Sequence, residues 1–217
     1  QSVNKDEWDT NDNENSIYNF NHEWIAQSRR LLKDNGTIWI SGTHHNIFTV
    51  GQLLKENNFK ILNIITWEKP NPPPNFFFFF FSHSSEWIIY ARKHSKSPRY
   101  FVSAFMKKLN GDKQAKDVWR LPAVSNWEKE QGKHPTQKPL GLLSRIILAS
   151  TKKGNMVLDP FSGSGTTGIA ATILGRQFIG IDKELEFLEL SKRRYQAITP
   201  KSKYEFKQKI REQISLV

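Results

Sequence analysis

Hydrophobic positions along the 217-residue chain follow two periodicities, one typical of helices and the other of buried strands. Five segments repeat apolar side chains every three or four residues, which predicts helices at 24–32, 47–54, 139–150, 166–174 and 185–195. Short apolar runs bounded by turn residues predict strands at 37–41, 60–67, 86–91, 156–159 and 177–182. Strands that alternate with helices indicate an α/β fold, and the last two strands predict a right-handed β-α-β unit.

The segment 92–131 follows neither periodicity. It combines charged residues with scattered aromatic ones, which favours a loop-rich insertion that faces an anionic ligand. After Thr199 the chain mixes apolar and cationic residues, and this mixture favours a surface helix. The six consecutive phenylalanines Phe76–Phe81 would place bulky groups on both faces of a strand. A core strand is one interpretation of this run, and we attach no function to it.

Charge is distributed unevenly. Residues 1–23 hold six acidic residues and one lysine, whereas the whole chain carries a formal charge of +11, so the remainder is strongly cationic. Residues 90–120 alone hold nine cations and two acids. Such a surface attracts a polyanion, and nucleic acid is the leading partner, with a merely solvated basic surface as the alternative.

Composition excludes several other classes of protein. Without cysteine, the chain has no disulfide scaffold, no cysteine-ligated metal centre and no thiol nucleophile, and its composition fits the cytoplasm. Only 37% of the residues are hydrophobic, and no run approaches the roughly 18 apolar residues of a membrane span. We expect no targeting segment in the polar first 23 residues, and the length fits one domain with an insertion.

A glycine-rich loop follows the strand predicted at 156–159. It reads Asp-Pro-Phe-Ser-Gly-Ser-Gly-Thr-Thr-Gly over residues 159–168, and its glycines fit the G-x-G-x-x-G pattern. No lysine follows them, which argues against a phosphate-binding P-loop. Asp159 would repel the pyrophosphate of a dinucleotide but suits a cationic ligand, and Asp182 ends the next strand, where a ribose needs an acceptor. These residues favour S-adenosylmethionine over NAD.

The same loop resembles the cofactor motif of amino-group DNA methyltransferases. Residues 132–139, Gly-Lys-His-Pro-Thr-Gln-Lys-Pro, are similar to the second cofactor motif of that family. The order of the motifs resembles the permuted beta group, in which the catalytic motif comes first, the target-recognition region next and the cofactor loop last. The resemblance covers about 8–195. It implies a Rossmann-like, doubly wound and mainly parallel sheet with a basic, loop-rich insertion.

The resemblance implies S-adenosylmethionine as the cofactor and assigns contacts to it. Contacts with its methionine and adenosine parts fall on the glycine-rich loop, at Asp159, Pro160, Phe161, Gly163, Ser164, Gly165 and Thr166. Asp182 would bind the ribose hydroxyls. His134, Thr136 and Lys138, in the second motif, would close over the cofactor.

The resemblance also divides the chain, which we expect to form one methyltransferase domain, 1–217. The expected parts are a substrate-side half of the sheet at 24–91, a target-recognition insertion at 92–131, a cofactor-binding half at 132–197 and a tail at 198–217.

The family uses an [Asp/Asn/Ser]-Pro-Pro-[Tyr/Phe] tetrapeptide to hold and stack on a flipped base, and this sequence does not contain one. The nearest string, at 71–74, is Asn-Pro-Pro-Pro, whose last residue has no ring, so we assign it no catalysis. In the permuted group the tetrapeptide precedes the segment around Trp8, and we expect it ahead of Gln1. A catalytically inactive subunit is the alternative, and the catalytic residues stay unknown.

Candidates for DNA contacts are less specific. Three cations in and beside the insertion could contact phosphates, with a solvated surface as the alternative: Arg92, Lys93 and Arg99. Three aromatic residues would either stack on bases or pack inside the protein: Tyr100, Trp119 and Trp127. His44 and His45 have no third ligand at a metal-binding spacing, so we expect no metal site.

Together these observations predict a site-specific DNA methyltransferase of a prokaryotic restriction-modification or epigenetic system, with adenine N6 preferred over cytosine N4 as the acceptor. Double-stranded DNA is the expected partner, a homodimer or a restriction-system protein is a further candidate, and the cytoplasm, at the nucleoid, is the expected location. Two alternatives stay open: a non-catalytic nucleic-acid-binding protein that keeps the cofactor fold, and an NAD-binding oxidoreductase.

Overall fold

The structure is a computed structural model that describes residues 14–72, 74, 79, 81–96 and 98–215. The chain forms two compact units, one made of 1–67 with 85–100 and the other of 68–84 with 101–217. No helix within the described ranges is long and apolar enough to cross a membrane.

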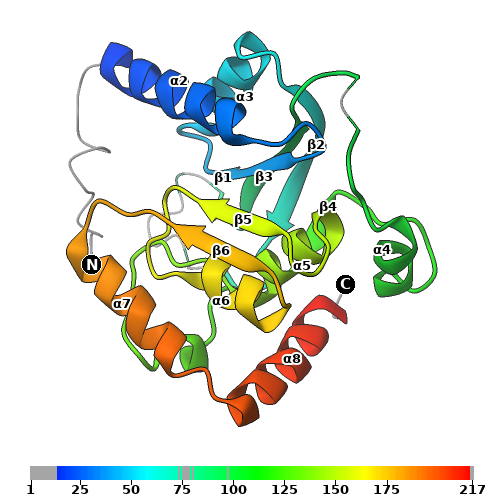
Figure 1. The fold of residues 1–217 in the computed structure, drawn as a ribbon, viewed down its shortest axis with the longest axis vertical. Coiled ribbons are helices and arrows are strands. Elements are labelled where there is room, and N and C mark those ends of the chain that lie inside the picture. Colours follow the sequence, from blue (N-terminus) through cyan, green and yellow to red (C-terminus); the bar gives the residue numbers. More distant parts are fainter. Residues whose placement is uncertain (1–13, 73, 75–78, 80, 97, 216–217) are drawn as a thin grey trace. The chain divides into compact units, whose positions relative to one another are not determined.

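The first unit combines two helices with three strands (Figure 1). Its elements are α2 (Glu14–Leu31), β1 (Thr37–Gly42), α3 (Ile47–Glu56), β2 (Lys60–Glu68) and β3 (Ser85–Arg92). The strands lie in the order β1-β3-β2, and α3 packs against both α2 and β3. Apolar side chains from both helices and from β3 form the core: Ile25, Ile47, Val50, Leu53, Leu54, Phe59, Ile89 and Ala91.

Strands β1 and β3 pair in antiparallel orientation, with Ile38 opposite Ala91 and Ile40 opposite Ile89. The expected parallel pairing does not extend to this pair. Parallel strands that follow one another need a crossover connection, usually a helix. Strand β3 is reached through residues 69–84, and the described part of this connection contains no helix that could serve as a parallel crossover.

The second unit contains the predicted β-α-β unit. Strands β5 (Met156–Asp159) and β6 (Gln177–Gly180) run parallel and side by side, and α6 (Thr166–Ile173) connects them (Figure 1). The remaining elements are α4 (Ser103–Leu109), β4 (Val118–Arg120), the 3-10 helix η1 (Asn126–Lys129), α5 (Leu140–Ser150), α7 (Leu185–Gln196) and α8 (Pro200–Ser215). Strand β6 ends two residues earlier than predicted, but Ile181 still donates its N–H to the Asp159 carbonyl over 2.9 Å.

Helix α5 is central to the core of the second unit, because it packs against both α6 and α8. The tail expected as a surface helix is α8, and its Ile210 is buried in that core. Phe206 of α8 stacks on Trp127, with ring centroids 5.3 Å apart. Trp119 is buried as well, 4.5 Å below the guanidinium carbon of Arg145. Trp119 therefore packs inside the protein, and Trp127 is half-buried against the core of the second unit.

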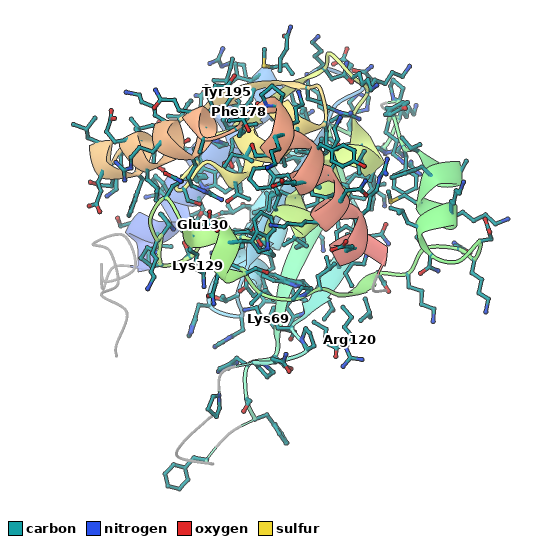
Figure 2. The ribbon with its side chains drawn as sticks, turned by 90° about the horizontal axis from the view of Figure 1, so that it is seen from below. Lys69, Arg120, Lys129, Glu130, Phe178 and Tyr195 are labelled. Atoms are coloured by element: carbon teal, nitrogen blue, oxygen red, sulfur yellow. The ribbon has the colours of Figure 1, made fainter. Side chains whose placement is uncertain are left out.

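The two ends of the segment between β2 and β3 are joined by a 2.7 Å hydrogen bond from the Lys69 N–H to the Ser84 carbonyl. Lys69 and Arg120 are labelled in Figure 2, and Arg120 of β4 lies 3.5 Å from the carboxylate of Glu68, the residue before Lys69. Phe79 and Phe81 are 90% and 96% exposed, so the core-strand interpretation is wrong for these two residues. The rest of the phenylalanine run lies outside the described residues.

Candidate functional site

The carboxyl ends of β5 and β6 bring two carboxylates to one edge of the sheet. Asp159 is the last residue of β5, and Asp182 follows β6 by two residues. Parallel strands end at the same edge, so both aspartates border the loop between β5 and α6. A 2.9 Å hydrogen bond from the Ser162 N–H to the Ile181 carbonyl ties this loop to the segment that carries Asp182.

The carboxylate of Asp159 is partly buried and accepts two hydrogen bonds. Oδ2 accepts from the Thr167 hydroxyl over 2.6 Å, and Oδ1 accepts from the Phe161 N–H over 3.1 Å. Burial raises the pKa of Asp159, and the charge of Asp182 adds to this effect, whereas the two hydrogen bonds oppose it. A carboxylate that is costly to ionise in the free protein gains from the approach of a cation.

This pKa predicts how cofactor affinity depends on pH. As the pH falls through the raised pKa of Asp159, protonation removes the attraction of this carboxylate for an ammonium group, so the dissociation constant for S-adenosylmethionine should rise. Folding should respond in the opposite sense, because a raised folded-state pKa stabilises the fold as the pH falls through it. Asp159→Asn can keep both hydrogen bonds, with the Thr167 hydroxyl as the acceptor in one of them. In this variant the dissociation constant, measured by titration calorimetry at several pH values, should depend less on pH. An equally steep dependence on pH would contradict the assignment.

Asp182 holds the backbone of the glycine-rich loop. Its Oδ2 accepts the N–H of Gly163 over 2.6 Å, and its Oδ1 accepts the N–H of Glu184 over 3.0 Å. The loop needs glycine at two positions, because Gly163 and Gly165 have φ of +49° and +72°, in the left-handed region. Each carboxylate oxygen can accept a further bond, so Asp182 keeps acceptor capacity for a ligand.

The second predicted motif lies against the glycine-rich loop. A Cβ on Gly163 would come within 3.0 Å of Nε2 of His134, so the histidine ring would have to shift by a few tenths of an ångström to admit a side chain there. His134 Nδ1 accepts the N–H of Thr136 over 3.2 Å, and the His134 ring packs against Phe187 of α7 with centroids 4.2 Å apart. The structure thus brings His134 to the loop. Thr136 is exposed and bonded to His134, and Lys138, in the same segment, is partly exposed.

Apolar side chains beside the two aspartates are open to solvent. Phe161 is 53% exposed, Ile181 53% and Leu185 70%. Phe161 and Ile181 follow the ends of β5 and β6 within two residues, and Leu185 begins α7, so all three lie within three residues of Asp159 or Asp182 along the chain. An aromatic and aliphatic surface next to an acidic one suits a ligand that joins a flat heterocycle to a polar, cationic part.

Sequence reasoning missed three residues that hold this site together. Thr167 binds Asp159, and Arg194 of α7 donates from Nη1 to the Ser164 carbonyl over 2.5 Å. Glu128 of η1 is buried and accepts the N–H of Leu140 over 2.7 Å. Thr167 lies within the motif itself. Arg194 and Glu128 carry no local signal, because charged residues in helices usually face solvent.

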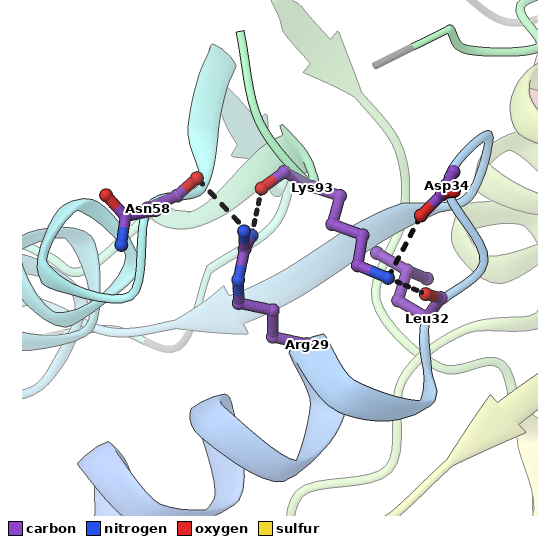
Figure 3. A network of polar contacts seen from close by, with 5 residues as sticks. All are labelled: Arg29, Leu32, Asp34, Asn58 and Lys93. Carbon is purple, nitrogen blue, oxygen red and sulfur yellow. Dashed lines mark hydrogen bonds and ion pairs between the residues drawn. The ribbon is translucent and has the colours of Figure 1, made fainter. Parts of the chain in front are cut away.

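The three DNA-contact candidates belong to the first unit, and local partners engage two of them. Arg92 donates from Nη2 to the Ser95 carbonyl. Lys93 Nζ donates to the Leu32 carbonyl over 2.7 Å and lies 3.2 Å from the Asp34 carboxylate (Figure 3). A phosphate contact by Lys93 would have to compete with both groups.

Arg99, the third candidate, is exposed and interacts with Tyr90. Burial raises the pKa of Tyr90, and the charge and hydrogen bond of Arg99 oppose that shift. The predicted aromatic candidate next to it, Tyr100, is partly exposed.

The contacts of Lys93 predict a structural effect of its removal. Lys93→Met should lower the free energy of unfolding by about 0.5–1 kcal/mol, because a cation at the C-terminal end of α2 is lost. The affinity for duplex DNA should stay within twofold of the wild type. Chemical denaturation and fluorescence anisotropy would measure the two quantities, and a large loss of DNA affinity at unchanged stability would assign Lys93 to the DNA surface instead.

His44 and His45 lie beside each other, with ring centroids 3.8 Å apart. Among the residues that the structure describes, no group of three or more histidine, cysteine, aspartate or glutamate side chains is placed to hold a metal ion.

Comparison with known proteins agrees with this geometry. A family model described as "DNA methylase", for N6 and N4 methyltransferases, matches residues 2–193. The type II methyltransferase M2.MboI of Moraxella bovis is 79% identical over 217 residues, which are all of this chain and 80% of that protein. M2.DpnII of Streptococcus pneumoniae is 52% identical over 197 residues, which are 90% of this chain and 74% of that protein.

Solved structures show the same relationship. The complex of M1.HpyAVI with SAM superimposes with a TM-score of 0.71 and 36% identity, over 82% of this chain and 83% of that one. PvuII DNA methyltransferase, described as cytosine-N4-specific, has a TM-score of 0.72 at 17% identity and shares the fold, over 92% of this chain and 78% of that one. The chain belongs to the N6/N4 DNA methylase family, and its fold is the α/β fold of DNA methyltransferases.

Proposed function

We propose that this DNA methyltransferase transfers a methyl group from S-adenosylmethionine to adenine N6 in duplex DNA, as part of a restriction-modification system. The observation that carries the proposal is the meeting of the two cofactor motifs, where His134 lies over Gly163 in a loop bordered by Asp159 and Asp182. Relatives named as type II methyltransferases, at 79% and 52% identity, support the restriction-modification setting. The SAM complex of a 36% identical protein supports the cofactor.

The residues of the site fit S-adenosylmethionine better than NAD. The partly buried carboxylate of Asp159 suits an ammonium group and disfavours a pyrophosphate. Asp182 keeps acceptor capacity for ribose hydroxyls, and the exposed ring of Phe161 can pack beside an adenine. The loop backbone from Gly163 to Thr166 would line the methionine part, next to Pro160.

When bound, the cofactor supplies a methyl group activated by a sulfonium centre. The protein's contribution at this site is positioning, which converts a reaction between two molecules into one within a complex. Asp159 and Asp182 would fix the two polar ends, while His134 and Thr136 would lie over the loop and limit the access of water. Lys138, at the end of the same motif, would contact the cofactor carboxylate from the rim.

The division of the chain and the DNA surface follow as parts of the proposal. The cofactor-binding half would be 132–197, the substrate-side half 24–91 and the target-recognition insertion 92–131, followed by the tail at 198–217. Arg99 would contact phosphates from the first unit. In the second unit the exposed cations Lys107 and Lys108 of the insertion are separate candidates for phosphate contacts. A second copy of the chain or a restriction-system protein is the proposed further partner, and the bacterial cytoplasm the proposed location.

Adenine N6 is the proposed acceptor because it is the more frequent one in the permuted group that the sequence resembles. The solved structure described as cytosine-N4-specific shares only 17% identity with this chain. Its similarity supports the same fold but does not indicate which base is methylated. The catalytic tetrapeptide expected ahead of Gln1 stays a prediction. The string at 71–74, part of which lies outside the described residues, receives no catalytic role.

One experiment tests the whole proposal. The full-length protein is incubated with tritiated S-adenosylmethionine and duplex DNA, and the digested nucleosides are identified by mass spectrometry. N6-methyladenine is the expected product, N4-methylcytosine would correct the acceptor, and transfer to neither base would support a non-catalytic DNA-binding protein. Thermal stabilisation by NAD and not by S-adenosylmethionine would instead support an oxidoreductase.

A further inference from the structure

Helix α7 contacts both cofactor motifs through one face. Phe187 packs on the His134 ring. Leu190 lies close to Gly132, because a Cβ added to that glycine would come within 2.8 Å of the Leu190 Cδ1. Ser191, one turn after Phe187, lies close to the glycine-rich loop, because a Cβ added to Gly165 would come within 2.1 Å of the Ser191 Oγ. Residues three and four apart share a helix face. One face of α7 therefore contacts both the second motif and the glycine-rich loop and fixes their positions relative to each other.

Arg194 is the last member of this face, and its charged side chain is buried. Its side chain is 7% exposed, and Nη1 donates to the Ser164 carbonyl over 2.5 Å and to the Thr166 hydroxyl over 2.9 Å. These acceptors flank Gly165, the residue with φ of +72° where the loop turns into α6. Arg194 therefore holds the backbone carbonyl of the residue before Gly165 and the side chain of the residue after it.

A buried carboxylate accompanies this buried guanidinium. Burial lowers the pKa of Arg194 to about 10, and the charge of Glu128 opposes the shift. Glu128 also accepts the N–H of Leu140, at the start of α5, and the N–H of Ser125 over 3.3 Å. An uncompensated buried charge is costly, so the attraction of Glu128 helps to keep Arg194 inside the protein.

We propose that Arg194 is a positioning residue that sets the conformation of the glycine-rich loop for cofactor binding, without touching the cofactor. The inference rests on the proposed function, because it assumes that the loop binds S-adenosylmethionine. Arg194 acts through the carbonyl of Ser164 and the hydroxyl of Thr166, and the opposite charge of Glu128 supports its buried position.

The test compares Arg194→Met with Arg194→Lys, Glu128→Gln and Arg193→Met in the full-length protein. Arg193 is the exposed neighbour of Arg194 on α7, so its variant removes the same charge without changing the loop. Arg194→Met should raise the dissociation constant for S-adenosylmethionine about tenfold, with an unchanged KM for DNA. Arg194→Lys retains a donor and should recover part of the affinity, and Arg193→Met should bind as the wild type does.

A second measurement does not depend on the cofactor. Hydrogen exchange of peptides that cover 160–170, in protein without cofactor, should become faster in Arg194→Met and not in Arg193→Met. Glu128→Gln should weaken binding about threefold on its own and less in the Arg194→Met background, because the two residues act as one unit.

The possible results separate the two proposals. Wild-type protein that does not bind S-adenosylmethionine would overturn the proposed function. Wild-type binding together with unchanged affinity in Arg194→Met, at a lowered melting temperature, would leave the function standing and overturn the role of Arg194. A tenfold loss of affinity with faster loop exchange supports both proposals.

Discussion

Replacement of Gly165 by alanine is expected to lower the free energy of unfolding by about 2–4 kcal/mol, from backbone strain and steric overlap combined. A Cβ at this position would lie 2.1 Å from Oγ and 2.8 Å from Cβ of Ser191, and the Cα of Ser191 is only 3.2 Å away. Rotation of the hydroxyl cannot relieve the last two contacts. The loop or α7 would have to move, so cofactor affinity should fall along with stability, and chemical denaturation and titration calorimetry measure the two.

A matched control separates strain from overlap. Gly154 has φ of +79°, and a Cβ there would meet no atom within 4 Å. Gly154→Ala should therefore cost only the strain, about 1 kcal/mol, and leave cofactor affinity unchanged. The double variant Gly165→Ala with Ser191→Gly should recover most of the difference. Equal losses for the two alanine variants would show that the contact with Ser191 is not tight.

Asp182→Ala is expected to raise the dissociation constant for S-adenosylmethionine about 100-fold, since hydrogen bonds to a charged group contribute roughly 1.5–3 kcal/mol each. The variant removes the acceptor for the N–H groups of Gly163 and Glu184, and with it the proposed acceptor for the ribose hydroxyls. The loss of the loop contact and the loss of the ribose contact should both weaken binding of S-adenosylmethionine. Titration calorimetry with S-adenosylmethionine measures the change.

Two further variants identify the cause of the affinity loss expected for Asp182→Ala. Asp182→Asn keeps one oxygen acceptor and should lose about tenfold in affinity. Glu186→Ala removes an exposed carboxylate from the first turn of α7 and should bind the cofactor as the wild type does. If Asp182→Ala bound S-adenosylmethionine with wild-type affinity, the site assignment would be wrong, whereas a loss in Glu186→Ala of similar size would indicate a general effect of charge.

Much of the fold could be predicted where a segment carries its own periodicity. The β-α-β unit was predictable because β5, the glycine-rich loop and α6 follow one another within 18 residues, from Met156 to Ile173. Helix α4 was not, because it spans only seven residues, of which Met106 alone is buried. The antiparallel pairing of β1 with β3 also escaped prediction, since strand direction depends on a connection that has no periodic signal.

The candidate site also has parts that could be predicted from the sequence and parts that could not. The positive φ of Gly163 and Gly165 requires glycine, so these two residues indicate the backbone conformation of the loop. The burial of Arg194 depends on acceptors 28 and 30 residues away, and no spacing within α7 distinguishes it from the exposed Arg193. Lys93 was a DNA candidate from charge alone, and only the folded chain shows that Leu32 and Asp34 engage it.

The single contact face of α7 makes this helix intolerant of changes in length. Phe187, Ser191 and Arg194 are spaced by four and three residues, so each lies about one turn from the next. Deletion of one residue between Phe187 and Ser191 would rotate Arg194 by about 100° around the helix axis and carry it away from the loop. We therefore expect α7 to tolerate substitutions on its outer face but not insertions or deletions between Phe187 and Arg194.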